Sequence, residues 1–482
     1  FGSRRVVLQT LIWDTMRNFC LVLVALLWHE FEAVEPDADW PPDVQSHRAL
    51  LPFGQKVRDA FFQFGPGFLN FNHGGFGATP RPVRQAMEAF TDQMEAQPTL
   101  WFGLKFGYKS ILEKVRPVLA HLIGADPEHT IFLDNVSAGL NAVLRSIAWK
   151  PGDILLLTMA AYAVLPNTAS WLESRYGIRT LRIPIMYPVV GPDAYIDPVR
   201  RALRNLTQGD RARVRLAVFD HISSYPAALL PVEDLARCVK TETGGHGLVL
   251  LDGAHALGQI HINIHDLHVA GVDFYVADGH KWLMSPHGSA FMWVAPESQV
   301  LLQPDVISSD NAPGTPFQER FDYIGTQDYT PWCSMGAAVE FRARKLGGEV
   351  RIVEYIHDLA TWAGQMLATR FDTEVLAPSN MTTAITNVRL PIPLEWPPDN
   401  QSACATIIGE ELVTTHNMQV ITFSLHSRVY EKKIETTKET HWARISAQVY
   451  LEKADFYLLG TRILSIAAGC RGPLGLEAVS IV

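Results

Sequence analysis

Short apolar runs separated by helical stretches dominate the middle of this chain. They are Thr130–Leu133, Asp153–Leu157, Val214–Phe219, Leu248–Leu251, Val272–Val276 and Ala290–Val294. Runs of this length that alternate with helices are typical of strands buried in a parallel sheet, because helices then cover both faces of the sheet. The sequence therefore predicts an α/β domain with a mostly parallel sheet.

The alternation of apolar runs and helices ends after Ala290–Val294. A loop rich in Asp, Pro and Gly at residues 310–315 precedes helical periodicity through residues 337–367 and then mixed short segments. We expect a large α/β domain over residues 52–310 and a smaller α+β domain over residues 311–482. The segment 52–80 is expected to contribute to the smaller domain and to the substrate mouth.

Residues 1–51 contain one apolar run, Phe19–Trp28, behind several arginines. A membrane-spanning helix needs about 20 apolar residues, so this run is too short to cross a bilayer. No small-x-small cleavage site follows it, which makes a secretory leader the less favoured interpretation. We interpret residues 1–51 as an extension, or as an error in the gene prediction, and expect a cytoplasmic protein without a membrane span.

Charge and cysteine content argue against two further classes of function. The chain carries 41 basic and 50 acidic residues, a net charge of −9 and no long basic block, so nucleic-acid binding is not expected. The five cysteines are scattered, without a C-x-x-C pair or a Cys/His cluster. The sequence therefore predicts neither a metal site nor a disulfide framework, as in a reducing compartment.

Residues suited to chemistry follow five of the six apolar runs. They are Asn135-Val136-Ser137-Ala138-Gly139, Tyr162, Asp220-His221, Asp252-Gly253-Ala254-His255 and Asp278-Gly279-His280-Lys281. Each group alone has an ordinary structural explanation, such as a helix cap or a turn. Because ligands bind beyond the carboxyl ends of the strands in open α/β sheets, we expect the five groups to meet at one site.

Lys281 is the most informative of these residues. Beside a buried strand its amine would be partly desolvated, and an uncharged amine forms a Schiff base with a carbonyl. The alternative is a surface lysine whose stem lies along the protein. Together with an upstream aspartate at a strand end and a helix start suited to phosphate, this lysine indicates a site for pyridoxal 5′-phosphate.

Several stretches, in this order along the chain, resemble the class V aminotransferase family of fold-type I pyridoxal phosphate enzymes. The most similar branch contains isopenicillin N epimerase and C–S lyases such as those of ergothioneine biosynthesis. The stretches are FLNFNHGGFG (68–77), NVSAGLN (135–141), DGAHALG (252–258), DFY (273–275), HKWL (280–283), GTQD (325–328) and RISAQ (444–448). The resemblance covers about residues 52–460. It implies a seven-stranded, mostly parallel sheet, a smaller C-terminal α+β domain and a homodimer with shared active sites.

The resemblance implies a role for each matching residue around the cofactor ring. Lys281 would hold the cofactor as a Schiff base and later move the substrate Cα proton. Asp252 would pair with the pyridinium nitrogen. His255 would lie against the ring and its phenolic oxygen, and Tyr162 would stack on the ring face.

A second set of residues would bind the phosphate. Ser137 and the backbone of Ala138 would contact it with help from His280, while Gly325 and Thr326 would reach it from the partner subunit. These roles again follow from the resemblance.

A third set would bind the amino acid substrate. Arg444 would hold the substrate α-carboxylate, a bidentate task that suits a guanidinium group. Asn72, His73 and Gly74 would line the substrate mouth.

Four stretches depart from the family's pattern. Met159-Ala160-Ala161 replaces a polar run before the stacking aromatic, Asp278-Gly279 replaces an Asn/Cys pair, and Pro286-His287-Gly288 replaces Pro-Lys/Arg-Gly. The segment 428–440, just before Arg444, is also unlike its counterparts. We therefore expect this chain to differ from its relatives in the substrate pocket.

The motifs determine the cofactor and the first step but not the product. Our leading interpretation is an epimerase-like enzyme that acts at Cα of an amino acid or amino acid derivative. The alternative is a C–S lyase that eliminates a β-substituent, and transamination is a third outcome. Epimerisation needs a second base on the far face of the substrate, for which His73, His221 and Tyr225 are candidates.

Two other readings are less favoured. Desulfurases that pass on a persulfide need a cysteine shortly before the carboxylate-binding arginine, and none lies between Met418 and Arg444. A non-catalytic relative would have no need to keep Lys281, Asp252 and Arg444 together.

Overall fold

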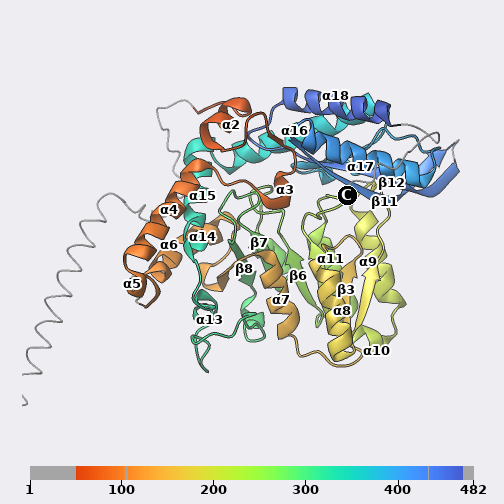
Figure 1. The fold of residues 1–482 in the computed structure, drawn as a ribbon. Helices are drawn as coiled ribbons and strands as arrows, with labels where there is room; N and C mark the ends of the chain where they lie inside the picture. Colours follow the sequence, from red (N-terminus) through yellow and green to blue (C-terminus); the bar gives the residue numbers. More distant parts are fainter. Residues whose placement is uncertain (1–49, 104–106, 432–433, 471–482) are drawn as a thin grey trace, which may run out of the picture. The chain divides into compact units, whose positions relative to one another are not determined.

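The computed structural model describes residues 50–103, 107–431 and 434–470 (Figure 1). The apolar run Phe19–Trp28 and nearly all of the predicted extension lie outside these ranges. No helix within the described ranges is long and apolar enough to cross a membrane.

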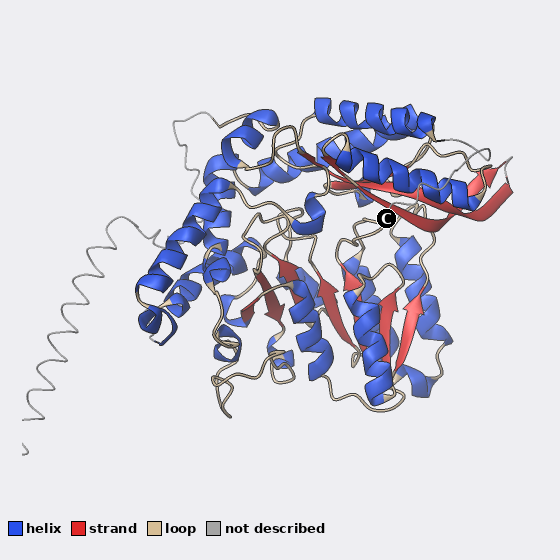
Figure 2. Ribbon diagram, viewed as in Figure 1, coloured by secondary structure: helices blue, strands red, loops and turns tan. Residues whose placement is uncertain are grey.

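A seven-stranded sheet forms the centre of the α/β part (Figure 2). Its strands are β2 (Thr130–Leu133), β3 (Ile154–Thr158), β4 (Arg179–Ile183), β5 (Val214–Asp220), β6 (Leu248–Asp252), β7 (Phe274–Asp278) and β8 (Ala290–Val294). Their spatial order is β2-β8-β7-β6-β5-β3-β4. Only β8 runs antiparallel to its neighbours, so the predicted mostly parallel seven-stranded sheet is confirmed.

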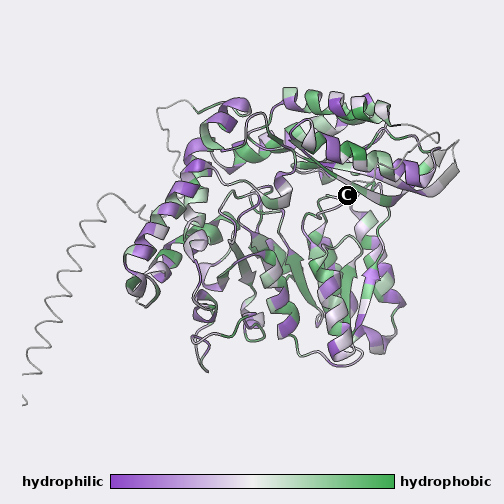
Figure 3. Cartoon of the chain, viewed as in Figure 1, coloured by the Kyte–Doolittle hydropathy of each residue, from purple (hydrophilic) through white to green (hydrophobic). Residues whose placement is uncertain are grey.

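Alternate residues of the buried strands pack into two separate cores. In β3, Leu155 and Leu157 pack into one core with α7 (Val136–Ser146) and α8 (Val164–Tyr176). Ile154 and Leu156 pack on the opposite face. Successive side chains of a strand point to opposite faces, so strands apolar at every position need helices on both sides. In Figure 3 the central strands of this sheet are largely green, whereas the helices around them carry both green and purple residues.

The helices on the second face and the remaining short helices complete the α/β part. They are α9 (Asp193–Asn205), α10 (Gln208–Arg211), α11 (Val232–Thr243) and α12 (Ile264–Ala270), with the 3₁₀ turns η2 (Pro127–His129) and η3 (Pro296–Ser298). A further group of helices packs largely on one another: α4 (Arg81–Ala96), α5 (Pro98–Gly103), α6 (Tyr108–Leu122), α13 (Glu319–Asp322), α14 (Thr330–Cys333) and α15 (Met335–Leu346) (Figure 1). Of these, α6 and α13 contact β2. α4 carries Pro82 in its first turn, where a proline is well tolerated because no helical N–H is lost.

The C-terminal part contains a three-stranded antiparallel sheet covered by helices. Its strands are β9 (Ile385–Arg389), β11 (Ile421–Glu431) and β12 (Ile434–Ser446), and its helices are α16 (Glu349–Phe371), α17 (Pro398–Thr414) and α18 (Lys453–Gly469), with the turn η4 (Ser379–Met381). Helical periodicity at 337–367 proves to be two helices, because Gly347 and Gly348 both have positive φ and end α15.

The segment before α4 adjoins this C-terminal part. It contains α2 (Gln55–Phe61), β1 (Leu69–Asn70) and α3 (His73–Phe76), and β1 pairs in parallel with β10 (Met418–Gln419). The N–H of Ser446 also donates to the carbonyl of Phe71 (2.7 Å). Residues near position 70 are thereby joined to the strand that carries Arg444.

One disulfide lies in the C-terminal part of the chain. Cys404 in α17 and Cys470 after α18 are bonded, with their Cα atoms 5.7 Å apart. The two helices pack side by side, which brings together cysteines 66 residues apart in sequence. Cys238 and Cys333 are free and buried. A single bond is not a framework, and the cytoplasmic location stays a prediction.

Candidate active site

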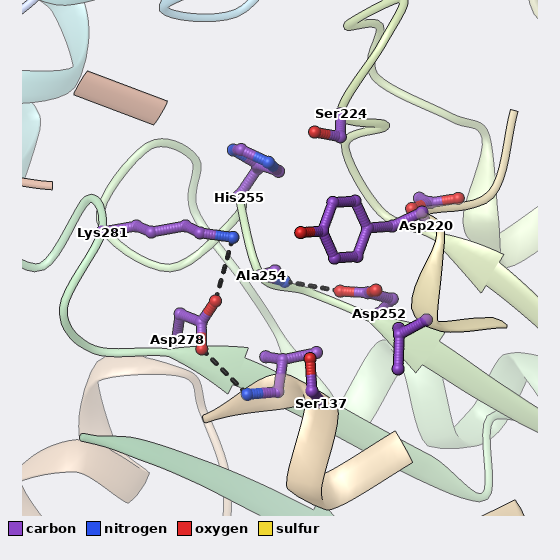
Figure 4. A pocket seen from close by; sticks show the side chains of 11 residues that line it. Ser137, Asp220, Ser224, Asp252, Ala254, His255, Asp278 and Lys281 are labelled. Atoms are coloured by element: carbon purple, nitrogen blue, oxygen red, sulfur yellow. Dashed lines mark hydrogen bonds and ion pairs between the residues drawn. The ribbon is translucent and has the colours of Figure 1, made fainter. Parts of the chain in front are cut away.

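Three neighbouring strands of the large sheet each end in an aspartate. β5 ends at Asp220, β6 at Asp252 and β7 at Asp278, and all three side chains line one pocket with Lys281 (Figure 4). Parallel strands deliver their carboxyl ends to the same edge of a sheet. The expected meeting of the strand-end groups is thus observed, since each of the five groups has at least one residue in the lining of this pocket.

Lys281 lies in the turn after β7 and points into this pocket. Its Nζ is 3.0 Å from Oδ2 of Asp278, and its side chain is only 15% exposed. The other oxygen of Asp278, Oδ1, accepts the N–H of Val136 at the start of α7 (2.9 Å). Asp278 therefore links the amine of Lys281 to the start of α7 through its two carboxylate oxygens.

The start of α7 supplies a small-residue surface beside the lysine. Asn135 caps the helix by accepting the N–H of Ala138 (2.9 Å), and Ser137 lines the pocket. A Cβ on Gly139 would lie 2.6 Å from a Val276 methyl, so this turn lies directly on β7. The helix start favours an anion through its partial positive charge. Because the N–H of Ala138 is already bonded to Asn135, the Ser137 side chain is the polar group of this turn that faces the pocket.

Asp252 and His255 lie deep in the pocket. Asp252 accepts the N–H of Ala254 (2.9 Å), and burial raises the pKa of its carboxyl to about 6. Burial, together with nearby cationic groups such as Lys281, lowers the pKa of His255 well below its ordinary value, so its imidazole is neutral. Its Nδ1 faces the indole N–H of Trp282 (3.4 Å). The pair offers one acidic and one neutral group to a bound ring.

Arg444 is a buried cation without a carboxylate partner in the described part of the chain. Its guanidinium donates to Oδ1 of Asn72 (2.6 Å) and to the carbonyl and hydroxyl oxygens of Ser224 (3.0 and 3.1 Å), while its Nε–H has no partner. It also lies 5.0 Å from the ring centre of Tyr225. Burial lowers its pKa to about 10, so it remains charged at neutral pH. A buried, incompletely satisfied guanidinium is suited to an incoming carboxylate.

Other predicted residues lie around or away from the pocket. Tyr162 lines it and is 43% exposed. Gly74 packs near His255, since a Cβ there would lie 3.4 Å from the imidazole. The ring of His73 is fully buried, with Nδ1 bonded to the hydroxyl of Tyr450 (3.0 Å) and Nε2 to the carbonyl of Lys281 (3.1 Å). It supports the lysine turn and has no ring nitrogen free for a substrate.

Three further predicted residues do not line the pocket. The Nδ1 of His280 is 3.7 Å from Asp278. Gly325 and Thr326 lie in a loop that is fastened to the α7 region by a hydrogen bond from Gln327 to Asp134 (3.0 Å). Neither residue is part of the pocket formed by the described ranges.

The pocket also contains residues to which the sequence assigned no role. Asp220 and Asp278 were recognisable as strand-end acids, whereas nothing in the local sequence singles out Ser224. Ser224 is placed by the turn after β5, where it meets Arg444 from a strand more than 200 residues later.

The pocket residues fit pyridoxal 5′-phosphate. The mostly buried amine of Lys281 suits the aldehyde of the cofactor, and the helix start with Ser137 suits its phosphate. The buried carboxyl of Asp252 suits the pyridine nitrogen. The guanidinium of Arg444, which has no carboxylate partner within the described ranges, suits the carboxylate of an amino acid. Lys281, Ser137 and Asp252 line one pocket, and Arg444 is bonded to Ser224, which lines the same pocket.

Comparison with known proteins agrees with this chemistry. The family model described as Aminotransferase class-V matches residues 72–394. An L-cysteine desulfhydrase-like protein of Epichloe uncinata (lolT1) is 29% identical over 448 residues, covering 86% of this chain and 95% of the relative. Isopenicillin N epimerase of Streptomyces clavuligerus is 30% identical over 336 residues, covering 65% and 78%.

A solved structure shows the same fold. A variant of C-DES with glycine covalently linked to its PLP cofactor aligns with a TM-score of 0.64 and 19% identity, covering 84% of this chain and 98% of that chain. Another structure of that protein describes it as a cystine C–S lyase.

Proposed function

Because this chain belongs to the class V aminotransferase family, whose cofactor is pyridoxal 5′-phosphate, we propose that it is a C–S lyase acting on a cysteine-type amino acid. The observation that carries this choice over epimerisation is the state of the two histidines among the candidate second bases; the third candidate, Tyr225, packs against the guanidinium of Arg444. Both ring nitrogens of His73 are bonded within the protein, and Nδ1 of His221 is bonded to the hydroxyl of Tyr275 (3.0 Å). Lys281 then serves as the base at Cα.

Each residue of the site would have a specific task. Arg444 would bind the substrate carboxylate, supported by Asn72 and Ser224. Lys281, held by Asp278, would bind the cofactor covalently and carry the Cα proton. The bound cofactor withdraws electrons from Cα and so makes that proton acidic.

The remaining pocket groups would hold the cofactor itself. Asp252 would pair with the pyridine nitrogen, His255 would lie near the phenolic oxygen, and Tyr162 would cover the ring. Ser137, with Ala138 and His280 nearby, would hold the phosphate. Gly325 and Thr326 would complete a neighbouring phosphate site in a homodimer.

Elimination would convert L-cysteine and water into pyruvate, ammonia and sulfide. Lys281 would take the Cα proton, and the sulfur would leave Cβ as sulfide with the electron pair of the Cβ–S bond. A proton would then add to Cβ, and water would replace the amino group at Cα and release ammonia. A persulfide relay is not proposed, because Cys238 and Cys333 are buried and Cys404 is in a disulfide.

Product analysis distinguishes elimination from epimerisation. Incubated with L-cysteine, the holoenzyme is expected to release pyruvate and sulfide in equal amounts, and the residual amino acid should keep its L configuration. The Lys281→Ala variant serves as the blank. Accumulation of D-amino acid without pyruvate would favour the epimerase, the second candidate, to which the likeness to isopenicillin N epimerase points.

The carboxylate role of Arg444 gives a quantitative prediction. Arg444→Lys removes the bidentate fork and is expected to raise KM by about 10- to 100-fold with a smaller effect on kcat. Arg389→Lys is the matched control, since Arg389 lies on the adjacent strand β9 and pairs with Glu374 (3.2 Å). An unchanged KM in Arg444→Lys would contradict the assignment.

A further inference from the structure

Two of the strand-end aspartates stand directly beside each other. Asp220 and Asp252 are register partners in the parallel pair β5–β6, and each residue is 3% exposed. Partners at the same level of neighbouring strands project from the same face of a sheet. Figure 4 shows both carboxyl groups on the same side of the pocket, across from Lys281.

The hydrogen bonds of the two carboxyl groups are unequal. Asp252 accepts the N–H of Ala254, whereas Oδ2 of Asp220 is buried and has no partner within the described ranges. The nearby cation is engaged elsewhere, because Nζ of Lys281 is paired with Asp278 at 3.0 Å. A buried carboxyl oxygen without a hydrogen-bond donor disfavours negative charge on that carboxyl, so the charge of the pair belongs on Asp252.

The positive charge nearest in effect does not offset the burial of Asp220: Lys281 lowers the pKa of its carboxyl, but Nζ of Lys281 is paired with Asp278. Two buried tyrosines lie near it, Tyr187 and Tyr195, with hydroxyl oxygens 3.3 Å apart, and burial raises the pKa of each. The adjacent His221 is neutral, because burial lowers its pKa to about 4. Burial and the charge of Asp252 raise the pKa of Asp220 well above its ordinary value. Two adjoining carboxylates in such a site do not both ionise.

We propose that Asp220 retains a proton in the working enzyme and acts as a positioning residue. The Asp220–Asp252 pair then carries one negative charge, located on Asp252, which matches the single positive charge of a protonated pyridine nitrogen. This inference rests on the proposed pairing of Asp252 with the cofactor. The proposal adds that Asp252 pairs strongly with the pyridine nitrogen only while the neighbouring Asp220 is uncharged.

Substitution of Asp220 tests whether the neutral form is the functional one. Asparagine resembles a protonated carboxyl in shape and charge, so Asp220→Asn is expected to keep cofactor affinity and kcat/KM within about threefold of wild type. Asp153→Asn is the control, since Asp153 is a buried aspartate at the other end of β3. A loss in Asp220→Asn as large as that in Asp252→Asn would overturn the proposal.

Infrared spectroscopy reads the proton directly. The difference spectrum of wild type minus Asp220→Asn, at neutral pH, is expected to contain the C=O stretch of a protonated carboxylic acid, both with and without added pyridoxal phosphate. The difference spectrum against Asp153→Asn should lack it. A carboxylate signal for Asp220 instead would refute the inference. If the protein binds no pyridoxal phosphate, the proposed function fails while the infrared result still decides the protonation of Asp220.

Discussion

Lys281→Ala is expected to lower kcat/KM by about ten-thousand-fold or more, because it removes both the covalent anchor and the group that takes the Cα proton. In the structure this amine is held by Asp278 at 3.0 Å, and His73 supports the turn through the Lys281 carbonyl. Steady-state product formation with L-cysteine measures the loss.

The control variant changes a lysine that lies outside the active site. Lys56 is exposed in α2, and Lys56→Ala should behave as wild type. If a small amine added to the Lys281→Ala protein restores part of the rate, the base function is separated from folding. Activity of Lys281→Ala within tenfold of wild type would refute the role of Lys281.

Asp252→Asn is expected to lower kcat/KM by about 100- to 1,000-fold. An amide cannot supply the negative charge that keeps the pyridine nitrogen protonated, so the electron-withdrawing power of the ring falls. The expected pattern is weak activity with cofactor still attached to Lys281, seen as retained visible absorption. Full activity in Asp252→Asn would contradict the pairing.

Asp252→Asn should raise the stability of the apoprotein although it lowers activity. The pKa of Asp252 is raised to about 6 by burial, so the folded apoprotein binds this proton more tightly than the unfolded chain does. Its contribution to stability is therefore present at low pH and is lost as pH rises from about 4 to about 6. Relative to wild type, the Asp252→Asn apoprotein should gain on the order of 2 kcal/mol in unfolding free energy between these pH values, measured with urea.

The sequence predicted six of the seven strands of the sheet and missed one at its edge. All six stand at or near the predicted apolar runs, and β8 alone runs against the predicted parallel direction. The strand β4 was missed because Arg179 and Arg182 face outward at the edge of the sheet and interrupt any apolar run. Edge strands need apolar residues on fewer positions, so their sequences carry a weaker signal.

Site residues were predictable where they follow directly on a strand and belong to a short local motif. Lys281, Asp252 and Ser137 lie within or beside local motifs and meet in the pocket as expected. Ser224 was missed because its contact with Arg444 depends on how two distant parts of the chain pack. The burial of His73 was hidden for the same reason, since Tyr450 lies far along the chain.

The most direct test of the account is to locate the bond between protein and cofactor. The protein loaded with pyridoxal 5′-phosphate should be reduced with borohydride and digested, and its peptides should be examined by mass spectrometry. We expect one modified lysine, Lys281, and loss of the visible absorption band on reduction. A protein that takes up no cofactor, or that carries it on another lysine, would contradict the central claim.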